Sequence, residues 1–119
     1  MIKKQFGNPQ MTFGEKVLRL ALSIPKGKVT TYGAIARAAG GGPMASQSIT
    51  TILGKAYERG ERGIPFHRIV YADGHVWMDD RHRKERMKRY REERISVDER
   101  GRILNFQDML VHNLRLPKK

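Results

Sequence analysis

Apolar residues recur at helical spacing in three segments of the first half of the chain. In the first segment, every third or fourth residue from Phe13 to Ile24 is apolar, and Pro25 ends the pattern. Thr12 and Glu15 have the spacing of a capping box, in which each side chain bonds the other residue's backbone amide. The pattern therefore predicts a helix that begins after Thr12 and stops at Pro25.

Two shorter helical segments follow, joined by a glycine-rich turn at 40–43. Thr31 is placed to cap a helix that buries one side of Tyr32, Ile35 and Ala36 and ends at Gly40. The next helix is predicted from Met44 to Tyr57. Its outer face is small and polar, and consists of Gln47, Ser48, Thr51, Gly54 and Lys55. Two such helices predict a helix-turn-helix, with the second as recognition helix.

The second half of the chain contains two segments with the pattern of small β-hairpins. Residues 68–71 and 75–77 flank an Asp-Gly turn, and we expect this hairpin to form the wing. Residues 95–97 and 102–104 predict a second hairpin, before a tail anchored by Phe106, Met109 and Leu110. Between them, 81–94 predicts a strongly basic helix. The expected fold is mainly α with small β-hairpins, a winged helix-turn-helix DNA-binding domain.

Length, charge and composition narrow the function classes. The 119 residues fit one domain, at 11–119, after a flexible N-terminal segment at 1–10. The net charge of +12 favours a polyanionic partner, most often nucleic acid. The chain has no cysteine, which excludes disulfides and cysteine-based transfer chemistry. Without a long apolar run, we expect a cytoplasmic protein with no membrane partner.

Four short segments have the order and spacing of a known family. They are IPKGKVTTYGAIA at 24–36, LGKA at 53–56, IPFHRIV at 64–70 and LNF at 104–106. Together they resemble the C-terminal domain of the O6-alkylguanine-DNA alkyltransferases. That family carries a reactive cysteine where Phe66 stands here. The closest resemblance is therefore to the alkyltransferase-like proteins, which are non-enzymatic relatives that bind alkylated guanine in DNA and flag it for nucleotide excision repair.

The resemblance assigns roles to four residues, and each has a simpler alternative. His67 and Glu93 occupy the positions of the family's proton relay, but a histidine that merely ties a strand to a helix would be placed in the same way. Phe66 would be the wall of a lesion pocket, on which an extruded base could stack, or a ring that fills the core. Tyr32 matches the tyrosine that helps to swing the nucleotide out, or is a core tyrosine.

Two departures from the family concern residues that hold the flipped base. The family inserts an arginine from the recognition helix into the duplex, and Thr51 stands at that position, with Gln47 and Lys55 one turn away on either side. A second arginine of the alkyltransferase-like branch contacts the lesion, and Asp79 stands there. A carboxylate accepts hydrogen bonds where the relatives donate, so the pocket need not prefer O6-alkylguanine.

The function implied by the resemblance is non-enzymatic sensing of damaged guanine in double-stranded DNA by nucleotide flipping. The expected partners of this monomer are DNA containing O6-alkylguanine and nucleotide excision repair proteins, without a cofactor. The predicted DNA contacts are Thr31, Tyr32, Gln47, Ser48, Thr51, Lys55 and Arg68. The predicted lesion pocket comprises Tyr32, Thr51, Phe66 and Asp79.

Two other function classes remain open from the sequence. One is a plain winged-helix module, regulatory or architectural, that reads DNA without flipping a base, as the missing intercalating arginine favours. The other is an enzyme with a new nucleophile or a metal. The four histidines show no metal-ligand spacing paired with carboxylates, so no metal site is predicted.

Overall fold

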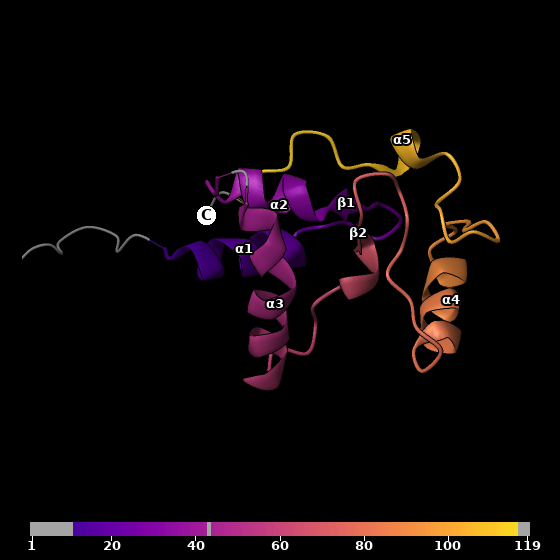
Figure 1. Ribbon diagram of the computed structural model, residues 1–119, viewed down its shortest axis with the longest axis horizontal. Coiled ribbons are helices and arrows are strands. Elements are labelled where there is room, and N and C mark those ends of the chain that lie inside the picture. Colours follow the sequence, from indigo (N-terminus) through magenta and orange to yellow (C-terminus); the bar gives the residue numbers. More distant parts are fainter. Residues whose placement is uncertain (1–10, 43, 117–119) are drawn as a thin grey trace, which may run out of the picture.

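The computed structural model describes residues 11–42 and 44–116, so the segment predicted to be flexible, 1–10, lies outside the described residues. The structure is mostly helical with one small sheet (Figure 1), which confirms the predicted class. No helix of the described ranges is both long and apolar enough to cross a membrane. The elements are α1 (Phe13–Leu22), β1 (Thr30–Thr31), α2 (Tyr32–Ala38), α3 (Ile49–Glu58), β2 (Ile69–Val70), α4 (Arg83–Glu92) and α5 (Phe106–Met109), with 3₁₀ turns η1 (Ala45–Ser48) and η2 (Phe66–Arg68).

Local sequence signals set the ends of α1 and α2. The capping box forms as predicted: the Thr12 hydroxyl accepts from the Glu15 amide at 3.1 Å, and the Glu15 carboxylate accepts from the Thr12 amide at 2.8 Å. The Thr31 hydroxyl caps α2 by accepting from the Ala34 amide at 3.0 Å. At its other end, the chain turns through Gly40 at φ 88°, a left-handed conformation that glycine adopts without strain.

The predicted helix from Met44 to Tyr57 begins differently. Its first turn is the 3₁₀ segment η1, and the α-helix starts only at Ile49. The Ser48 hydroxyl donates to the Ala45 carbonyl three residues earlier, at 2.8 Å, which suits the tighter turn. The polar outer face predicted for this segment is therefore divided between η1 and α3.

A parallel pair of short strands separates two hydrophobic cores. β1 pairs with β2, with Thr30 opposite Ile69 and Thr31 opposite Val70. Because successive strand side chains point to opposite faces, Ile69 packs into the core formed by α1, α2 and α3, which we call the helical core. Val70 packs into a second core on the α4 side. That second core contains Val29, Val70, Val76, Tyr90, Ile95 and Ile103.

The prediction of a wing hairpin at 68–77 was wrong in its pairing. The turn itself forms, with Gly74 at φ 91° and the Tyr71 amide donating to the His75 carbonyl at 2.9 Å. Beyond the turn, however, the chain pairs with a later segment. The Val76 amide donates to the Gly101 carbonyl, and His75 forms an isolated antiparallel β-bridge with Arg102. β2 has its partner in β1, so the chain after the turn pairs elsewhere.

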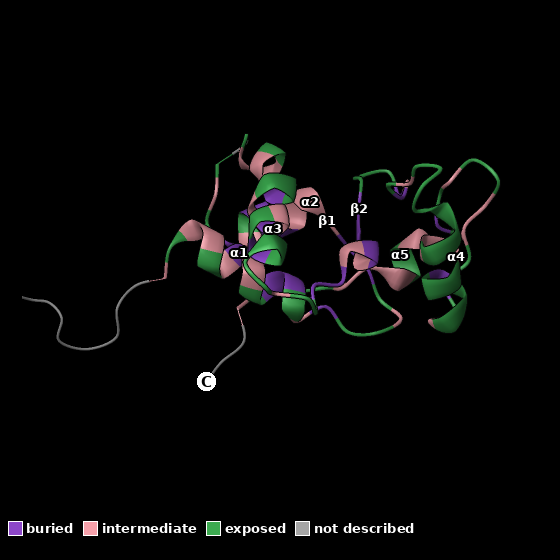
Figure 2. Cartoon of the chain, turned by 90° about the horizontal axis from the view of Figure 1, so that it is seen from below, coloured by how far each residue is buried: buried purple, intermediate pink, exposed green. Residues whose placement is uncertain are grey.

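The second predicted hairpin is present in reduced form. Val97 and Ile103 make one antiparallel bridge, closed by a bond from the Asp98 amide to the Arg102 carbonyl at 2.8 Å. The basic helix predicted at 81–94 appears as α4, trimmed at both ends. Tyr90 is its one buried residue, and most of the helix is exposed in Figure 2. α4 therefore stands beside the second core with most of its charged side chains toward solvent.

Candidate nucleic-acid interface

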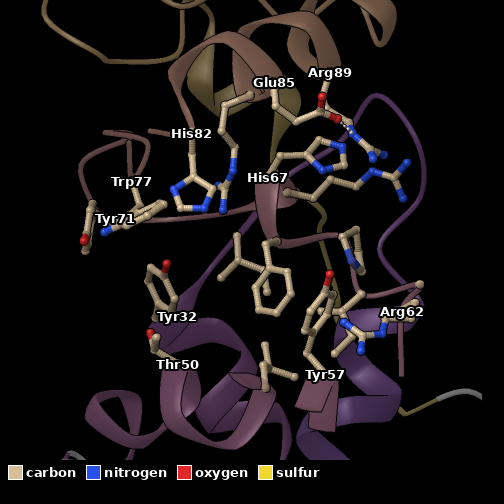
Figure 3. Close-up of a pocket in the computed structure, with 18 residues that line it drawn as sticks. Tyr32, Thr50, Tyr57, Arg62, His67, Tyr71, Trp77, His82, Glu85 and Arg89 are labelled. Atoms are coloured by element: carbon tan, nitrogen blue, oxygen red, sulfur yellow. Dashed lines mark hydrogen bonds and ion pairs between the residues drawn. The ribbon is translucent and has the colours of Figure 1, made fainter. Parts of the chain in front are cut away.

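A cavity of about 800 Å³ lies between the helix-turn-helix and α4 (Figure 3). Its floor is η2 with the residues that precede it, and its opposite walls come from α2 and α3 on one side and α4 on the other. Its size falls within the range of small-ligand pockets in proteins. The lining residues are Tyr32, Thr50, Leu53, Tyr57, Arg62, Gly63, Ile64, Pro65, Phe66, His67, Arg68, Ile69, Tyr71, Trp77, His82, Glu85, Arg86 and Arg89.

Phe66 lies on the wall of this cavity. Its ring is half-buried: it packs against the helical core and also borders the open space. It meets the ring of Tyr57 edge to face, with 6.0 Å between centroids. The position therefore combines the two interpretations that the sequence left open, because the ring fills core space and still presents a surface to the cavity.

Tyr32 is the first residue of α2 and lines the same cavity. Its ring is 5.4 Å from that of Tyr71, and Thr50 lies beside it (Figure 3). Burial, and secondarily the neighbouring Tyr71, raises the pKa of the Tyr32 hydroxyl. The hydroxyl therefore keeps its proton at neutral pH and is available as a hydrogen-bond donor toward the cavity or its mouth.

The two relay positions meet at the back of the cavity. The Glu93 carboxylate accepts from His67 Nε2 at 2.7 Å, from Arg68 Nη2 at 2.7 Å and from the Gly27 amide at 2.9 Å. Burial by itself would raise the pKa of Glu93, but these hydrogen bonds outweigh it and lower the pKa to about 2. Glu93 is thus a buried anion, held by three separate segments of the chain.

The ionised Glu93 fixes the protonation of His67. Burial lowers the pKa of His67, although the hydrogen bond to Glu93 opposes the shift, so the ring is neutral at neutral pH. Because a carboxylate can only accept, the proton of the neutral ring is on Nε2, and Nδ1 is left as an acceptor. The Tyr90 hydroxyl donates to the His67 carbonyl at 2.7 Å. His67 therefore links η2 to α4. Phe66 has no ionisable group that the histidine could activate.

Two residues predicted for the lesion pocket are not in its wall. Thr51 is exposed on α3, and its neighbour Thr50 lines the cavity instead. Asp79 is exposed beyond the cavity and bonds the His82 ring at 2.7 Å and the His82 amide at 2.8 Å, next to the start of α4. Counting along a sequence cannot fix helix rotation or the path of a loop, and contact of either residue with a lesion stays a prediction.

The remaining predicted DNA contacts fall into three groups. Gln47 and Lys55 are exposed on η1 and α3, while Ser48 and Thr31 use their hydroxyls for local backbone bonds. The Arg68 guanidinium is held inside by Glu93 and by the Ile24 carbonyl at 2.9 Å. Arg68 thus braces the end of α1 against α4, and contacts of these residues with DNA stay predictions.

Sequence reasoning missed several lining residues. Tyr57, Tyr71 and Trp77 are large, partly exposed aromatics around the cavity. Their aromatic character in otherwise polar segments was the available signal. Arg62 and Arg86 also line it, but nothing in a strongly basic sequence distinguishes them from other arginines. Within the described ranges, no group of three or more His, Asp or Glu is arranged to hold a metal ion.

Similar structures have been solved with DNA. The chain superimposes on Schizosaccharomyces pombe Atl1 in complex with damaged DNA containing O6-carboxymethylguanine, with a TM-score of 0.66 and 28% identity, covering 83% of this chain and 94% of Atl1. A second S. pombe ATL structure in complex with DNA matches with the same TM-score, 0.66, at 27% identity and equal coverage. At 83% coverage of this chain, the likeness extends over most of the fold.

Sequence comparison identifies relatives in bacteria and the family itself. Two proteins named DNA base-flipping protein, from Escherichia coli K12 and Shigella flexneri, are 34% identical over 65 residues. That match covers 55% of this chain but 48% of each relative, so the chain matches about half the length of these proteins. The family model of the 6-O-methylguanine DNA methyltransferase DNA-binding domain matches residues 12–95. The chain therefore belongs to the 6-O-methylguanine DNA methyltransferase DNA-binding domain family, with Phe66 at the position of the acceptor cysteine.

Proposed function

We propose that this protein binds double-stranded DNA, turns a damaged or alkylated guanine out of the helix into the cavity, and flags it for repair. The observation that carries the proposal is the position of Phe66 and Tyr32 on one open cavity beside the recognition helix. The relatives named for base flipping and the Atl1 complex with damaged DNA support the same function.

The chemistry of the cavity supports binding without alkyl transfer. Phe66 has no nucleophilic atom, and the chain contains no cysteine. His67 is neutral and donates its Nε2–H to Glu93. The two residues at the family's relay positions therefore form a structural brace. An extruded base would instead stack on aromatic rings of the cavity wall, which contributes about 1–3 kcal/mol per base. The protein would hold the lesion and leave it chemically unchanged.

A binding titration tests the proposal. We expect a duplex with one O6-methylguanine to bind more tightly than the same duplex with guanine, because only the modified base gains from extrusion into the pocket. Phe66→Ala and Tyr32→Ala should each reduce the difference, by about fivefold or more for loss of one stacking surface. The measurement is fluorescence anisotropy of labelled duplexes at fixed salt.

Two controls distinguish a loss of contacts in the pocket from a loss of folding. Tyr32→Phe keeps the ring and removes only the hydroxyl, so it should retain more of the preference for the modified duplex than Tyr32→Ala. Thermal unfolding of each variant, followed by far-UV circular dichroism, checks that the helices survive. Equal affinity of the wild-type protein for modified and unmodified DNA would refute damage sensing.

A plain DNA-binding module is the second candidate, favoured by one observation. α3 contains no arginine, and Thr51 is exposed where the family's intercalating arginine would be expected. A winged-helix regulator would bind both duplexes equally and prefer particular sequences over others. The same titration, extended to unrelated sequences, therefore distinguishes the two functions.

The assembly and partners complete the proposal. We also propose that the protein acts as a monomer. Lesion binding without chemistry requires a further step by other proteins, and nucleotide excision repair is the class of pathway that removes a bulky, protein-marked site. Sedimentation with and without damaged duplex tests the monomer, and a pull-down from extract with and without damaged DNA tests the partners.

A further inference from the structure

Four arginines line the cavity, and two of them are neutralised within the protein. Arg68 pairs with Glu93 at 2.7 Å, and Arg89 pairs with Glu85 at 2.9 Å. Arg62 and Arg86 have no carboxylate within ion-pair distance in the part of the chain that the structure describes. The aromatic cavity therefore carries an excess of positive charge that the protein itself does not balance.

The two uncompensated guanidiniums lie on different sides of the cavity. Arg62 sits 4.1 Å above the Tyr57 ring and is exposed, near the edge seen at the lower right of Figure 3. Arg86 lies 5.2 Å from the Trp77 ring, and Trp77 is on the other side in that view. Arg86 is half-buried, so solvent screens its charge less than that of Arg62.

Arg86 also faces the side of the cavity on which Tyr32 lies. Burial raises the pKa of the Tyr32 and Tyr90 hydroxyls, and the positive charge of Arg86 opposes the rise in both. The guanidinium is therefore close to the tyrosine that begins α2. A guanidinium that lies over an aromatic ring, as Arg86 lies over Trp77, still has N–H groups at its edge that can bind a planar anion.

Building on the proposed function, we propose that the cavity selects guanine adducts that end in a carboxylate, with Arg86 as the residue that recognises the negative charge. A base stacked beside Phe66 and Tyr32 would direct its O6 substituent into the remaining space, between the aromatic wall and α4. A carboxylate there completes the missing ion pair of Arg86, whereas a neutral substituent leaves the guanidinium without a counter-ion.

The test compares two adducts of the same shape. One duplex carries O6-carboxymethylguanine, and its twin carries the neutral amide, O6-carbamoylmethylguanine, in the same sequence. Because phosphate contacts are identical, the ratio of their affinities reports the replacement of the charged carboxylate by a neutral amide. A charge-assisted hydrogen bond contributes about 1.5–3 kcal/mol, so we expect the carboxylate to bind roughly tenfold or more tightly.

Variants assign the preference to one side chain. Arg86→Gln should reduce the ratio to near one while leaving the affinity for the amide adduct above that for plain guanine, which also shows that the variant is folded. Lys84→Gln removes one positive charge from the same helix outside the cavity lining, and should keep the wild-type ratio. Arg86→Lys keeps the charge but not the planar stacking, and should give an intermediate ratio.

The possible outcomes distinguish charge selection by Arg86 from phosphate binding by Arg86 and from failure of the proposed function. Equal affinity for the two adducts, with both above plain guanine, would overturn charge selection and leave damage sensing standing. A ratio that survives in Arg86→Gln, or a loss of affinity shared by all duplexes, would overturn the assignment, the latter by showing that Arg86 holds a backbone phosphate. If neither adduct binds better than guanine, the proposed function fails as well.

Discussion

At the scale of single residues, Glu93 is an anion at the back of a cavity that contains no nucleophile to activate. Glu93 binds His67, Arg68 and the Gly27 amide at once, and thereby joins η2, α4 and the turn before β1. Its side chain is only 5% exposed, so removing its charge leaves Arg68 partly buried without a counter-ion. The cluster holds the cavity floor together without a nucleophile at position 66.

The first prediction concerns the stability that Glu93 contributes. Glu93→Gln should lower the free energy of unfolding at pH 7 by roughly 3 kcal/mol, because the ion pair is lost and the guanidinium stays desolvated. Urea unfolding followed by Trp77 fluorescence measures it. Glu92→Gln is the matched control, since Glu92 is exposed on the preceding position, and should change stability little.

The pH dependence has a defined sign. The pKa of Glu93 is lowered from 4.5 to about 2 in the folded state, so its contribution is complete above pH 4.5 and is lost as the pH falls toward 2. His67, whose pKa is also lowered, adds a loss of stability that begins as the pH falls below 6.5. A Glu93→Gln protein that still lost the same stability between pH 4.5 and 2 would contradict this account.

At the scale of elements, α3 has an outer face that is not optimised for stability. Gly54 lies inside the helix, where glycine costs about 0.5–1 kcal/mol relative to alanine. A Cβ built there meets nothing within 4 Å, so no packing in the protein requires glycine. The absence of a side chain suits a surface that another molecule approaches closely.

The second prediction separates stability from binding at this position. Gly54→Ala should raise the free energy of unfolding by about 0.5–1 kcal/mol and weaken binding to any duplex several-fold, because the methyl group stands between helix and DNA. Thermal unfolding and anisotropy measure the two effects. Gly40→Ala is the contrasting variant, since its φ of 88° makes alanine strained and should lower stability. Unchanged DNA affinity in Gly54→Ala would remove α3 from the interface.

At the scale of the whole molecule, charge and shape act separately. In the proposed function, the net charge of +12 attracts any duplex, while the cavity between the helical core and α4 discriminates among bases. The general attraction to DNA and the preference for a modified base should therefore respond differently to salt. Phosphate contacts weaken as counterions compete, whereas the contacts of a stacked base inside the cavity do not involve counterion release.

The third prediction follows from this separation. Between 50 and 200 mM salt, affinity should fall by roughly a thousandfold for both modified and unmodified DNA, as for a protein that contacts six or more phosphates. The ratio of the two affinities should stay constant for a neutral adduct such as O6-methylguanine. Titrations at four salt concentrations measure both quantities. A ratio that collapses at high salt would show that the preference is electrostatic and does not arise from the pocket.

Local signals in the sequence determined the helices. The Thr12–Glu15 capping box, the Thr31 cap and Gly40 each act within a few residues, so their outcome did not depend on the rest of the chain. The His67–Glu93 contact was also predictable, although 26 residues separate the two, because a family pattern carried it. These features fix the fold class and the floor of the cavity.

The sequence by itself thus determined the helical elements, the basic charge and the loss of the nucleophile at Phe66. Only the tertiary structure decided which strand β2 joins, that Thr50 and not Thr51 borders the cavity, and that Arg86 reaches it while Asp79 does not. The physical reason is that strand pairing and helix rotation are settled by competition among distant segments for the same hydrogen bonds and the same buried space.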